Sequence, residues 1–281
     1  DDNEFHRARA LLDEVFGTDC LVATIAWQAR YSVSSDAAIS NSHNYILVYS
    51  KAPEKWRKIR NQVPRDEKQE KSYSNPDNDP RGPWRAIPWD APEEREESLS
   101  YPITTPKGSV RYPPKGRHWS GTRDGWDAIV AKGLDYFGQN QDGVPSYKKY
   151  LADAGTVVPV TWWPHESSGH TDEASKELST FQLETPFKTP KPLRLLRKII
   201  QIATKPDSII LDSFAGSATT AHAVLDVNRQ YGGSRRFILV EMEDYAKTLT
   251  AERVRKVING YEYKGTQRTQ LLRERLNWRV L

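Results

Sequence analysis

Three residues in the last third of the sequence, Asp212, Gly216 and Glu241, have the types and spacing of a site for a nucleotide-like ligand. Gly216 has no Cβ atom, so a ligand can lie directly against its backbone. Glu241 follows 25 positions later, and a carboxylate there can accept hydrogen bonds from both hydroxyls of a ribose. The chemistry that these residues predict is the binding of an adenosine-like group.

The residues around Gly216 favour one ligand class over two others. A phosphate-binding P-loop requires a lysine in the pattern GxxxxGK[ST], and this loop has none. A dinucleotide site requires the pattern GxGxxG, and only one of those glycines is present. S-adenosylmethionine has one adenosine and no phosphate, so one close backbone approach and one ribose-binding carboxylate suit it best. An ordinary tight turn in an α/β protein, without a ligand, is the alternative.

A strand–helix–strand–helix unit is expected to position these residues. SIILD (208–212) and RFILVE (236–241) are continuous apolar strands of the kind that a parallel sheet buries on both faces. TTAHAVLDVNRQ (219–230) is the helix between them, and AKTLTAERVRKVINGY (246–261) is the helix that follows. This order predicts a βαβ crossover with the loop at the carboxyl edge of the sheet. The two threonines that open the first helix are expected to cap it.

Regular elements are also expected near the start of the chain and before the βαβ unit. Apolar spacing predicts a helix over 4–16 and strands over 21–27 and 44–50. A further helix is expected over 191–204, where Pro192 stands at the start and leucines and isoleucines form one face.

The middle of the chain has a different composition. Eleven of the 18 prolines lie between Pro53 and Pro114, and seven of the nine tryptophans lie between Trp56 and Trp163. A segment with so little continuous apolar pattern predicts an irregular inserted lobe without a large core of its own. Burial of the large aromatic side chains is the expected way for such a lobe to hold together.

The overall composition narrows the classes of protein. The net charge is +4, from 41 Lys and Arg against 37 Asp and Glu, which favours an anionic partner only weakly. A single cysteine, Cys20, excludes a disulfide framework, and no apolar stretch reaches the ~18 residues of a membrane helix, so we expect a cytoplasmic protein. His165 and His170 lack a third nearby ligand, and no metal is expected.

At this point the residues resemble a known family. DSFAGSATTAHAV (212–224) resembles the glycine loop of amino-group DNA methyltransferases of the β type, and more narrowly the adenine-N6 modification subunits of type III restriction-modification systems. Six further stretches resemble successive blocks of that family in the same order: residues 1–17, 41–51, 75–84, 137–151, 161–174 and 189–200.

The resemblance implies a Rossmann-like α/β fold in permuted order, with an irregular inserted target-recognition lobe. Residues 1–51 would belong to the catalytic half, 52–160 to the recognition insertion and 161–281 to the cofactor-binding half. The implied activity is methyl transfer from S-adenosylmethionine to N6 of an adenine flipped out of duplex DNA. The implied partners are double-stranded DNA, a second copy of the chain and a restriction subunit.

Site residues follow from the matched motifs and from the basic residues of the lobe. Lys191 would lie near the methionine carboxylate of the cofactor, and Glu241 would hold its ribose. The expected cofactor-binding residues are Lys191, Pro192, Asp212, Phe214, Ala215, Gly216, Ser217, Thr219, Thr220 and Glu241. The candidate DNA-binding residues, for which a solvated mixed-charge surface is the alternative, are Lys55, Arg57, Lys58, Arg60, Arg81, Arg85, Arg111, Lys115 and Arg117.

The sequence departs from the family pattern in two places. Ala218 stands where the family loop has glycine, and a methyl group there restricts the backbone. The catalytic motif [D/N/S]PP[Y/F/W] is missing, since the Pro-Pro pair at 113–114 lacks both flanking partners. The family has that motif upstream of the block that opens this chain. We therefore expect an N-terminally truncated or split methyltransferase without a catalytic residue of its own.

Three hypotheses follow. In the first, the chain keeps the cofactor pocket, and a companion chain can supply the catalytic motif. In the second, it is a non-catalytic DNA-binding or assembly fragment. A dinucleotide-dependent enzyme is the third. The terminal stretch LLRERLNWRVL (271–281) is expected to be a packing helix.

Overall fold

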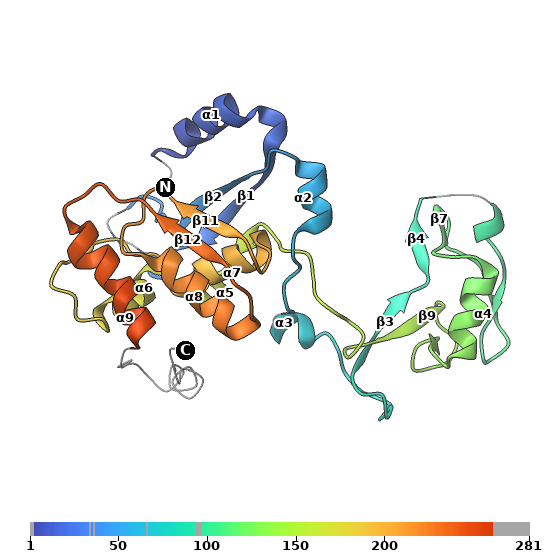
Figure 1. Ribbon diagram of the computed structural model, residues 1–281. Coiled ribbons are helices and arrows are strands. Elements are labelled where there is room, and N and C mark those ends of the chain that lie inside the picture. Colours follow the sequence, from blue (N-terminus) through green and yellow to red (C-terminus); the bar gives the residue numbers. More distant parts are fainter. Residues whose placement is uncertain (1–2, 34, 36, 66, 94–96, 261–281) are drawn as a thin grey trace. The chain divides into compact units, whose positions relative to one another are not determined.

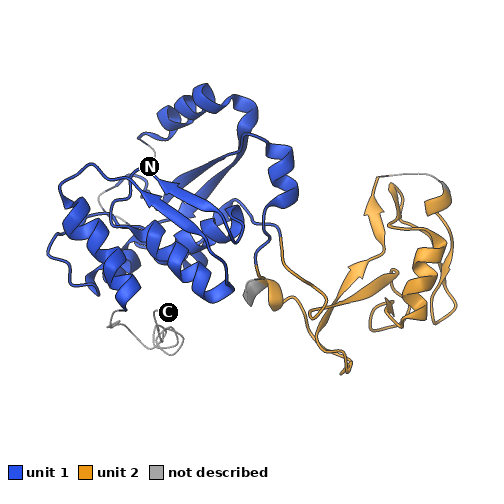
Figure 2. Cartoon of the chain, viewed as in Figure 1, with its two compact units in different colours: residues 1–63, 158–281 blue, residues 64–157 orange. Residues whose placement is uncertain are grey.

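The computed structural model describes residues 3–33, 35, 37–65, 67–93 and 97–260, so the terminal stretch 271–281 lies outside the described residues. The chain forms two compact units, residues 1–63 with 158–281 and residues 64–157 (Figure 2). The insertion was expected to begin at residue 52. Residues 53–63 belong to the first unit instead, because Trp56 and Val63 pack against its core.

One sheet of the first unit has the strand order β10-β1-β2. β1 (Leu21–Gln28) pairs antiparallel with β2 (His43–Tyr49), with Ile25 opposite Ile46, and parallel with β10 (Trp162–Trp163). These strands and the preceding helix confirm the prediction for the first fifty residues. The flanking helices are α1 (Phe5–Phe16), the 3-10 turn η1 (Thr18–Cys20), α2 (Pro53–Ile59), α5 (His165–Ser168) and α6 (Thr171–Ser179).

The predicted strand–helix–strand unit is also present. β11 (Ile209–Asp212) and β12 (Arg236–Leu239) are paired parallel, with Leu211 opposite Ile238, and α8 (Thr219–Tyr231) connects them (Figure 1). A short π-helical turn, η3 (Ala246–Thr250), leads into α9 (Ala251–Asn259). The chain is thus a mixed α/β protein, as expected.

Helix α7 (Leu193–Ala203) packs on both sheets of the first unit, because its apolar side chains form a broad stripe. Leu195 and Ile202 join a cluster with the buried residues of β1 and β10, while Leu193 and Ile200 join a cluster with α8. The core of the unit therefore lies on either side of this helix.

The two faces of the β11–β12 pair differ in burial. Ile210 and Phe237 pack against the cluster formed by α7 and α8. On the opposite face, four large aliphatic side chains are between 51% and 61% exposed, those of Ile209, Leu211, Ile238 and Val240. The sequence predicted strands that are buried on both faces, and among the described residues only one face is covered.

The second unit has more regular structure than the sequence predicted. Its elements are α3 (Glu67–Glu70), β3 (Trp84–Pro88), β4 (Asp90–Pro92), η2 (Glu97–Leu99), β5 (Ile103–Thr104), β6 (Val110–Arg111), β7 (Arg117–Trp119), α4 (Arg123–Ala131), β8 (Asp135–Tyr136) and β9 (Ser146–Tyr150). The largest sheet, of order β3-β9-β8, is antiparallel. The unit has a core of its own, made mainly of Trp89, Trp119, Trp126 and Phe137, and the expected burial of large aromatic side chains is confirmed.

Among the described residues, no helix has both the length and the apolar character needed to cross a membrane.

Candidate functional site

The loop 213–218 between β11 and α8 is a tight turn with two left-handed residues. Gly216 has φ +51° and Ala218 has φ +58°. Glycine adopts this conformation freely, whereas it costs an alanine about 1–2 kcal/mol. Ala215 donates its N–H to the carbonyl of Val240 (3.0 Å), and Ala218 donates to that of Ala215 (2.8 Å). These bonds fix the loop at the carboxyl edge of the strand pair.

Glu241 is joined directly to this loop. Its Oε2 accepts the N–H of Gly216 (2.8 Å), and its Oε1 accepts those of Met242 (2.9 Å) and Glu243 (3.1 Å). These backbone donors, together with the Tyr245 hydroxyl, lower the pKa of Glu241, so its carboxylate is ionised at neutral pH. The structure therefore brings together the glycine and the acid that the sequence singled out.

Asp212 also binds the loop, but the expected helix cap is absent. Its Oδ1 accepts the N–H of Phe214 (3.2 Å), and its Oδ2 accepts the hydroxyl of Thr220 (2.6 Å). The N-cap residue of α8 is Ala218, which has no side-chain oxygen, and Thr219 is already the first helical residue. The prediction that the threonines cap α8 is wrong, because the turn places the cap position one residue earlier.

The open side of Gly216 faces an aromatic ring. A Cβ built on Gly216 would lie 3.0 Å from Cζ of Phe187, and the Phe187 ring in turn contacts that of Tyr245, with centroids 5.5 Å apart. The sequence did not single out either aromatic residue. Gly216 thus allows another group to lie against its backbone, as expected, and in this structure that group is the ring of Phe187.

The remaining expected cofactor residues have different environments. Pro192 is fully buried immediately before α7. Lys191 donates to the carbonyl of Thr189 (3.4 Å), and partial burial lowers the pKa of its ammonium. Ala215 and Ser217 are buried within the loop, whereas Phe214 is 87% exposed.

Residues at the end of η3 and the start of α9 also hold the loop. The hydroxyl of Thr250 donates to the carbonyl of Gly216 (2.6 Å). Nη1 of Arg253 donates to the carbonyl of Ser217 (2.9 Å) and to Oγ1 of Thr219 (2.8 Å). These contacts were not foreseen. The sequence did contain a signal that Arg253 is buried. It is spaced four residues from Leu249 and four from Val257, and helical spacing places all three on one face.

A second carboxylate lies near this group in an apolar setting. Glu177 of α6 accepts the N–H of Leu193 at the start of α7 (2.9 Å). Burial raises the pKa of Glu177 to about 7, with Glu173 acting in the same direction and Arg253 and Arg197 opposing it. This carboxyl group therefore titrates near neutral pH.

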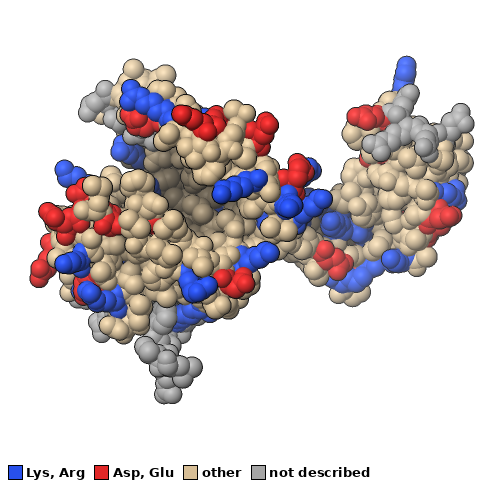
Figure 3. Space-filling view, turned by 45° about the horizontal axis from the view of Figure 1, so that its top comes forward, with Lys and Arg blue, Asp and Glu red and all other residues tan. Residues whose placement is uncertain are grey.

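Three candidate DNA-binding cations lie on α2 and a fourth, Arg60, directly follows it, so all four belong to the first unit rather than to the lobe. Lys55, Arg57 and Lys58 are exposed, and Arg60 is half-buried at an apolar cavity of about 260 Å³. Positive and negative side chains are interspersed on the visible face in Figure 3, and no region of it carries a single sign of charge.

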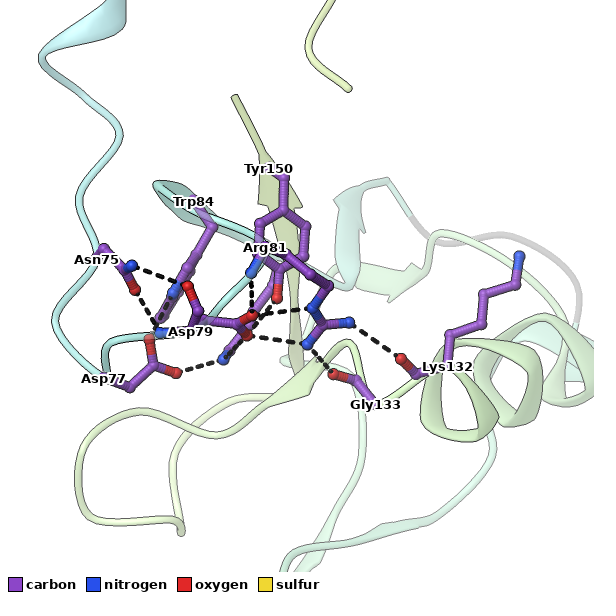
Figure 4. Close-up of polar contacts among 9 residues, drawn as sticks. Asn75, Asp77, Asp79, Arg81, Trp84, Lys132, Gly133 and Tyr150 are labelled. Atoms are coloured by element: carbon purple, nitrogen blue, oxygen red, sulfur yellow. Dashed lines mark hydrogen bonds and ion pairs between the residues drawn. The ribbon is translucent and has the colours of Figure 1, made fainter. Parts of the chain in front are cut away.

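Most of the candidate cations in the second unit already have partners there. Arg81 forms an ion pair with Asp79 (2.9 Å) and donates to two carbonyls (Figure 4). Arg117 pairs with Asp90, and Arg111 pairs with Asp142 at 3.3 Å. The last two candidates are Arg85, whose guanidinium lies 5.3 Å from the ring centroid of Tyr73, and Lys115, which is exposed.

His165 and His170, the pair singled out in the sequence, have structural contacts. His165 contacts Gln28, with 3.0 Å between Nδ1 and Oε1, and Nδ1 of His170 accepts the N–H of Glu173 at the start of α6. In the part of the chain that the structure describes, no three His, Cys, Asp or Glu residues gather in a group that could hold a metal ion.

The chain is similar in sequence to known DNA methyltransferases. The model of the DNA methylase family matches residues 1–252. The Mod subunit of the type III restriction-modification enzyme StyLTI from Salmonella typhimurium is 34% identical over 86% of this chain and 36% of its own length. The type II methyltransferase M.KpnI from Klebsiella pneumoniae is 28% identical over 86% of this chain and 60% of its own.

A third relative is the Mod subunit of the type III enzyme EcoPI from Escherichia phage P1, which is 27% identical over 87% of this chain. The chain spans between 36% and 60% of the lengths of these three relatives. Because the family model covers most of its residues, the chain belongs to the DNA methylase family of N6 and N4 methyltransferases.

Proposed function

We propose that this chain carries the cofactor-binding and DNA-recognition parts of an adenine-N6 DNA methyltransferase that uses S-adenosylmethionine. The observation that carries the proposal is the hydrogen bond between the N–H of Gly216 and Glu241 at the carboxyl ends of two parallel strands. Ligands of open α/β sheets bind at that edge. The permuted Rossmann-like fold and the three functional segments expected from the sequence are part of this proposal.

The cofactor would supply an electrophilic methyl group, and the residues of the site would bind and orient it. Glu241 would accept a ribose hydroxyl, and Lys191 would pair with the methionine carboxylate. A carboxylate has about four acceptor positions, and three backbone N–H groups and the Tyr245 hydroxyl use those of Glu241. A ribose would therefore replace the Tyr245 hydroxyl.

Displacement of the Tyr245 hydroxyl would also expose the backbone of Gly216. Phe187 contacts both Gly216 and Tyr245, so displacing the Tyr245 side chain would also release the ring that covers Gly216. The two aromatic side chains would then line the adenosine pocket. Binding must include this rearrangement, whose free-energy cost reduces the affinity.

Methyl transfer would require a further polypeptide segment that carries the catalytic tetrapeptide, supplied by a longer form of the chain or by a companion chain. Double-stranded DNA, a second copy of the chain and a restriction subunit are the proposed partners. Three of these relatives are named as modification or methyltransferase proteins that extend well beyond the matched region.

Calorimetric titration with S-adenosylmethionine tests the cofactor proposal. The parent chain should bind, and Glu241→Gln should bind roughly tenfold or more weakly because a hydrogen bond to a charged acceptor contributes about 1.5–3 kcal/mol. Gly216→Trp should abolish binding. Glu243→Gln, which leaves the Gly216 contact intact, is the matched control. Absence of binding to the parent chain would overturn the proposal.

A non-catalytic DNA-binding fragment is the second candidate, and the exposed cations of α2 and Lys115 favour it. It would bind duplex DNA with an affinity that falls steeply with salt, yet transfer no tritiated methyl group. Methyl transfer by the isolated chain would exclude this candidate and would also show that the missing tetrapeptide is dispensable. Binding of a nicotinamide dinucleotide in preference to S-adenosylmethionine would favour the third hypothesis.

A further inference from the structure

We propose that Arg253 of α9 is the positioning residue that sets the backbone conformation of the Gly216–Thr219 loop, and with it the affinity for the cofactor. The inference rests on the proposed function of the loop as a cofactor site. Its structural half, control of the loop conformation, can be tested without any ligand.

The contacts of Arg253 converge on one short stretch of chain. Nη1 lies 2.9 Å from the carbonyl oxygen of Ser217, 3.3 Å from the Ser217 hydroxyl and 2.8 Å from the Thr219 hydroxyl. Nη2 lies 3.3 Å from Nδ1 of His222, one turn into α8. One guanidinium group thereby connects the loop to the first turn of the helix that follows it.

Burial makes this geometry restrictive. Arg253 is 1% exposed, and its guanidinium lies 5.2 Å from the ring centroid of Phe181. An arginine stays charged and only donates hydrogen bonds, so Nδ1 of His222 must accept. Burial lowers the pKa of His222 well below its usual value, with Arg253 and Arg197 acting in the same direction, which keeps that imidazole neutral. A buried charge requires its hydrogen bonds, and the loop supplies them.

The carbonyl that Arg253 binds lies between the two left-handed residues. Ser217 is flanked by Gly216 and Ala218, with φ angles of +51° and +58°. The preceding carbonyl, that of Gly216, is held by the hydroxyl of Thr250, the last residue of η3 and the N-cap of α9. Two consecutive peptide groups are thus oriented from one short segment, residues 250–253.

These contacts also orient the loop donors. In a planar trans peptide, the carbonyl of one residue and the N–H of the next point in opposite directions. With the Gly216 carbonyl held by Thr250, the N–H of Ser217 points away from that hydroxyl. The hydrogen bonds of Arg253 offset the strain of an alanine with positive φ at position 218. Without Arg253 the loop would adopt other backbone conformations, and its N–H groups would no longer share one orientation.

The experiment is a double-mutant cycle between Arg253→Lys and Ala218→Gly. Lysine keeps the charge but lacks the planar fork, so it cannot reach the loop and His222 together. We expect Arg253→Lys to weaken S-adenosylmethionine binding about tenfold or more and to speed hydrogen exchange of the 216–219 amides. Ala218→Gly should restore part of both losses, because glycine adopts the left-handed conformation without strain.

Arg255→Lys is the matched control, since Arg255 lies two residues along the same helix and forms an exposed pair with Glu252. It should leave affinity and exchange unchanged. If Arg253→Lys fails to fold, Thr250→Val, which loses only the hydroxyl bond to Gly216, should show the same loop effects to a smaller degree.

Two results would overturn the inference: unchanged loop exchange in both Arg253→Lys and Thr250→Val, or an equal effect of Arg253→Lys in the parent chain and in the Ala218→Gly background. If the parent chain does not bind S-adenosylmethionine while the exchange data follow the expectation, the proposed function fails and the positioning role stands.

Discussion

Asp79, which is buried in the second unit, and Glu177, which is half-buried in the first, have surroundings that shift their pKa values in opposite directions. Asp79 accepts from Arg81, from the Tyr150 hydroxyl (2.5 Å) and from Lys148 (3.0 Å), and these donors lower its pKa far below the usual range. Glu177 accepts one backbone N–H, and burial raises its pKa to about 7.

The largest influence on Asp79 is its hydrogen bond from Arg81, whereas the largest influence on Glu177 is desolvation. A carboxylate that is surrounded by cations and hydroxyls is stabilised in its charged form, whereas one that is desolvated with a single N–H donor is not. The two units should therefore respond to pH in opposite ways, and hydrogen exchange can measure each unit separately within the same chain.

The largest expected effect concerns Glu177. Its folded-state pKa of about 7 lies above the usual 4.5, so the folded state binds the proton more tightly and the first unit loses stability as pH rises from 4.5 to 7. The loss is on the order of 3 kcal/mol. Glu177→Gln should abolish it, raising the free energy of unfolding at pH 8 relative to the parent chain. The exposed Glu14→Gln is the control, and a pH profile unchanged by Glu177→Gln would contradict the assignment.

Asp79 should give the opposite pH dependence in the second unit. Its depressed pKa means that its contribution is present above pH ~4 and is lost as pH falls further. Asp79→Asn should destabilise the second unit at pH 7 and flatten its stability profile below pH 4. Tryptophan fluorescence during urea unfolding at several pH values measures both, and a variant that keeps the acid sensitivity of the parent chain would refute the role of Asp79.

A smaller change separates hydrogen bonding from charge in the same cluster. Tyr150→Phe removes one donor to Asp79 and leaves Arg81 and Lys148 in place. We expect a loss of about 0.5–1.5 kcal/mol in the second unit, with the acid transition moved to slightly higher pH because the carboxylate has lost one donor. Tyr112→Phe, at an exposed tyrosine, should change neither quantity.

The smallest effects on stability are expected at the exposed cations. Arg57→Ala should leave the unfolding free energy unchanged and, if α2 contacts DNA, reduce the salt slope of DNA binding by about one. Arg81→Ala should lower the stability of the second unit, because it removes the ion pair with Asp79. Equal effects of the two substitutions on DNA binding would indicate that Arg81 also contacts DNA.

The sequence predicted the elements that depend on local pattern. The continuous apolar runs of β11 and β12, the helix between them and the glycine turn all lie within a residue or two of their expected positions. Arg253 and Phe187 were missed, since each contacts the loop across at least 29 residues of sequence and only tertiary packing brings them there.

The second unit begins later than the expected start of the insertion, for a related reason. Composition changes at Pro53, but the chain continues to pack on the first unit until Val63, because Trp56 and Val63 complete its apolar cluster. The second unit was expected to be irregular because short strands of two to five residues leave no periodic pattern that a sequence can reveal.

The bare aliphatic side of β11 and β12 has a practical consequence for anyone who purifies this chain. Four aliphatic side chains are exposed to water there, those of Ile209, Leu211, Ile238 and Val240. Burying their apolar surface against another molecule would be favourable by about 25 cal/mol for each Å². The protein should therefore self-associate at high concentration, and the apparent mass from light scattering should rise with concentration. Leu211→Asp should reduce this self-association and the rise in light scattering.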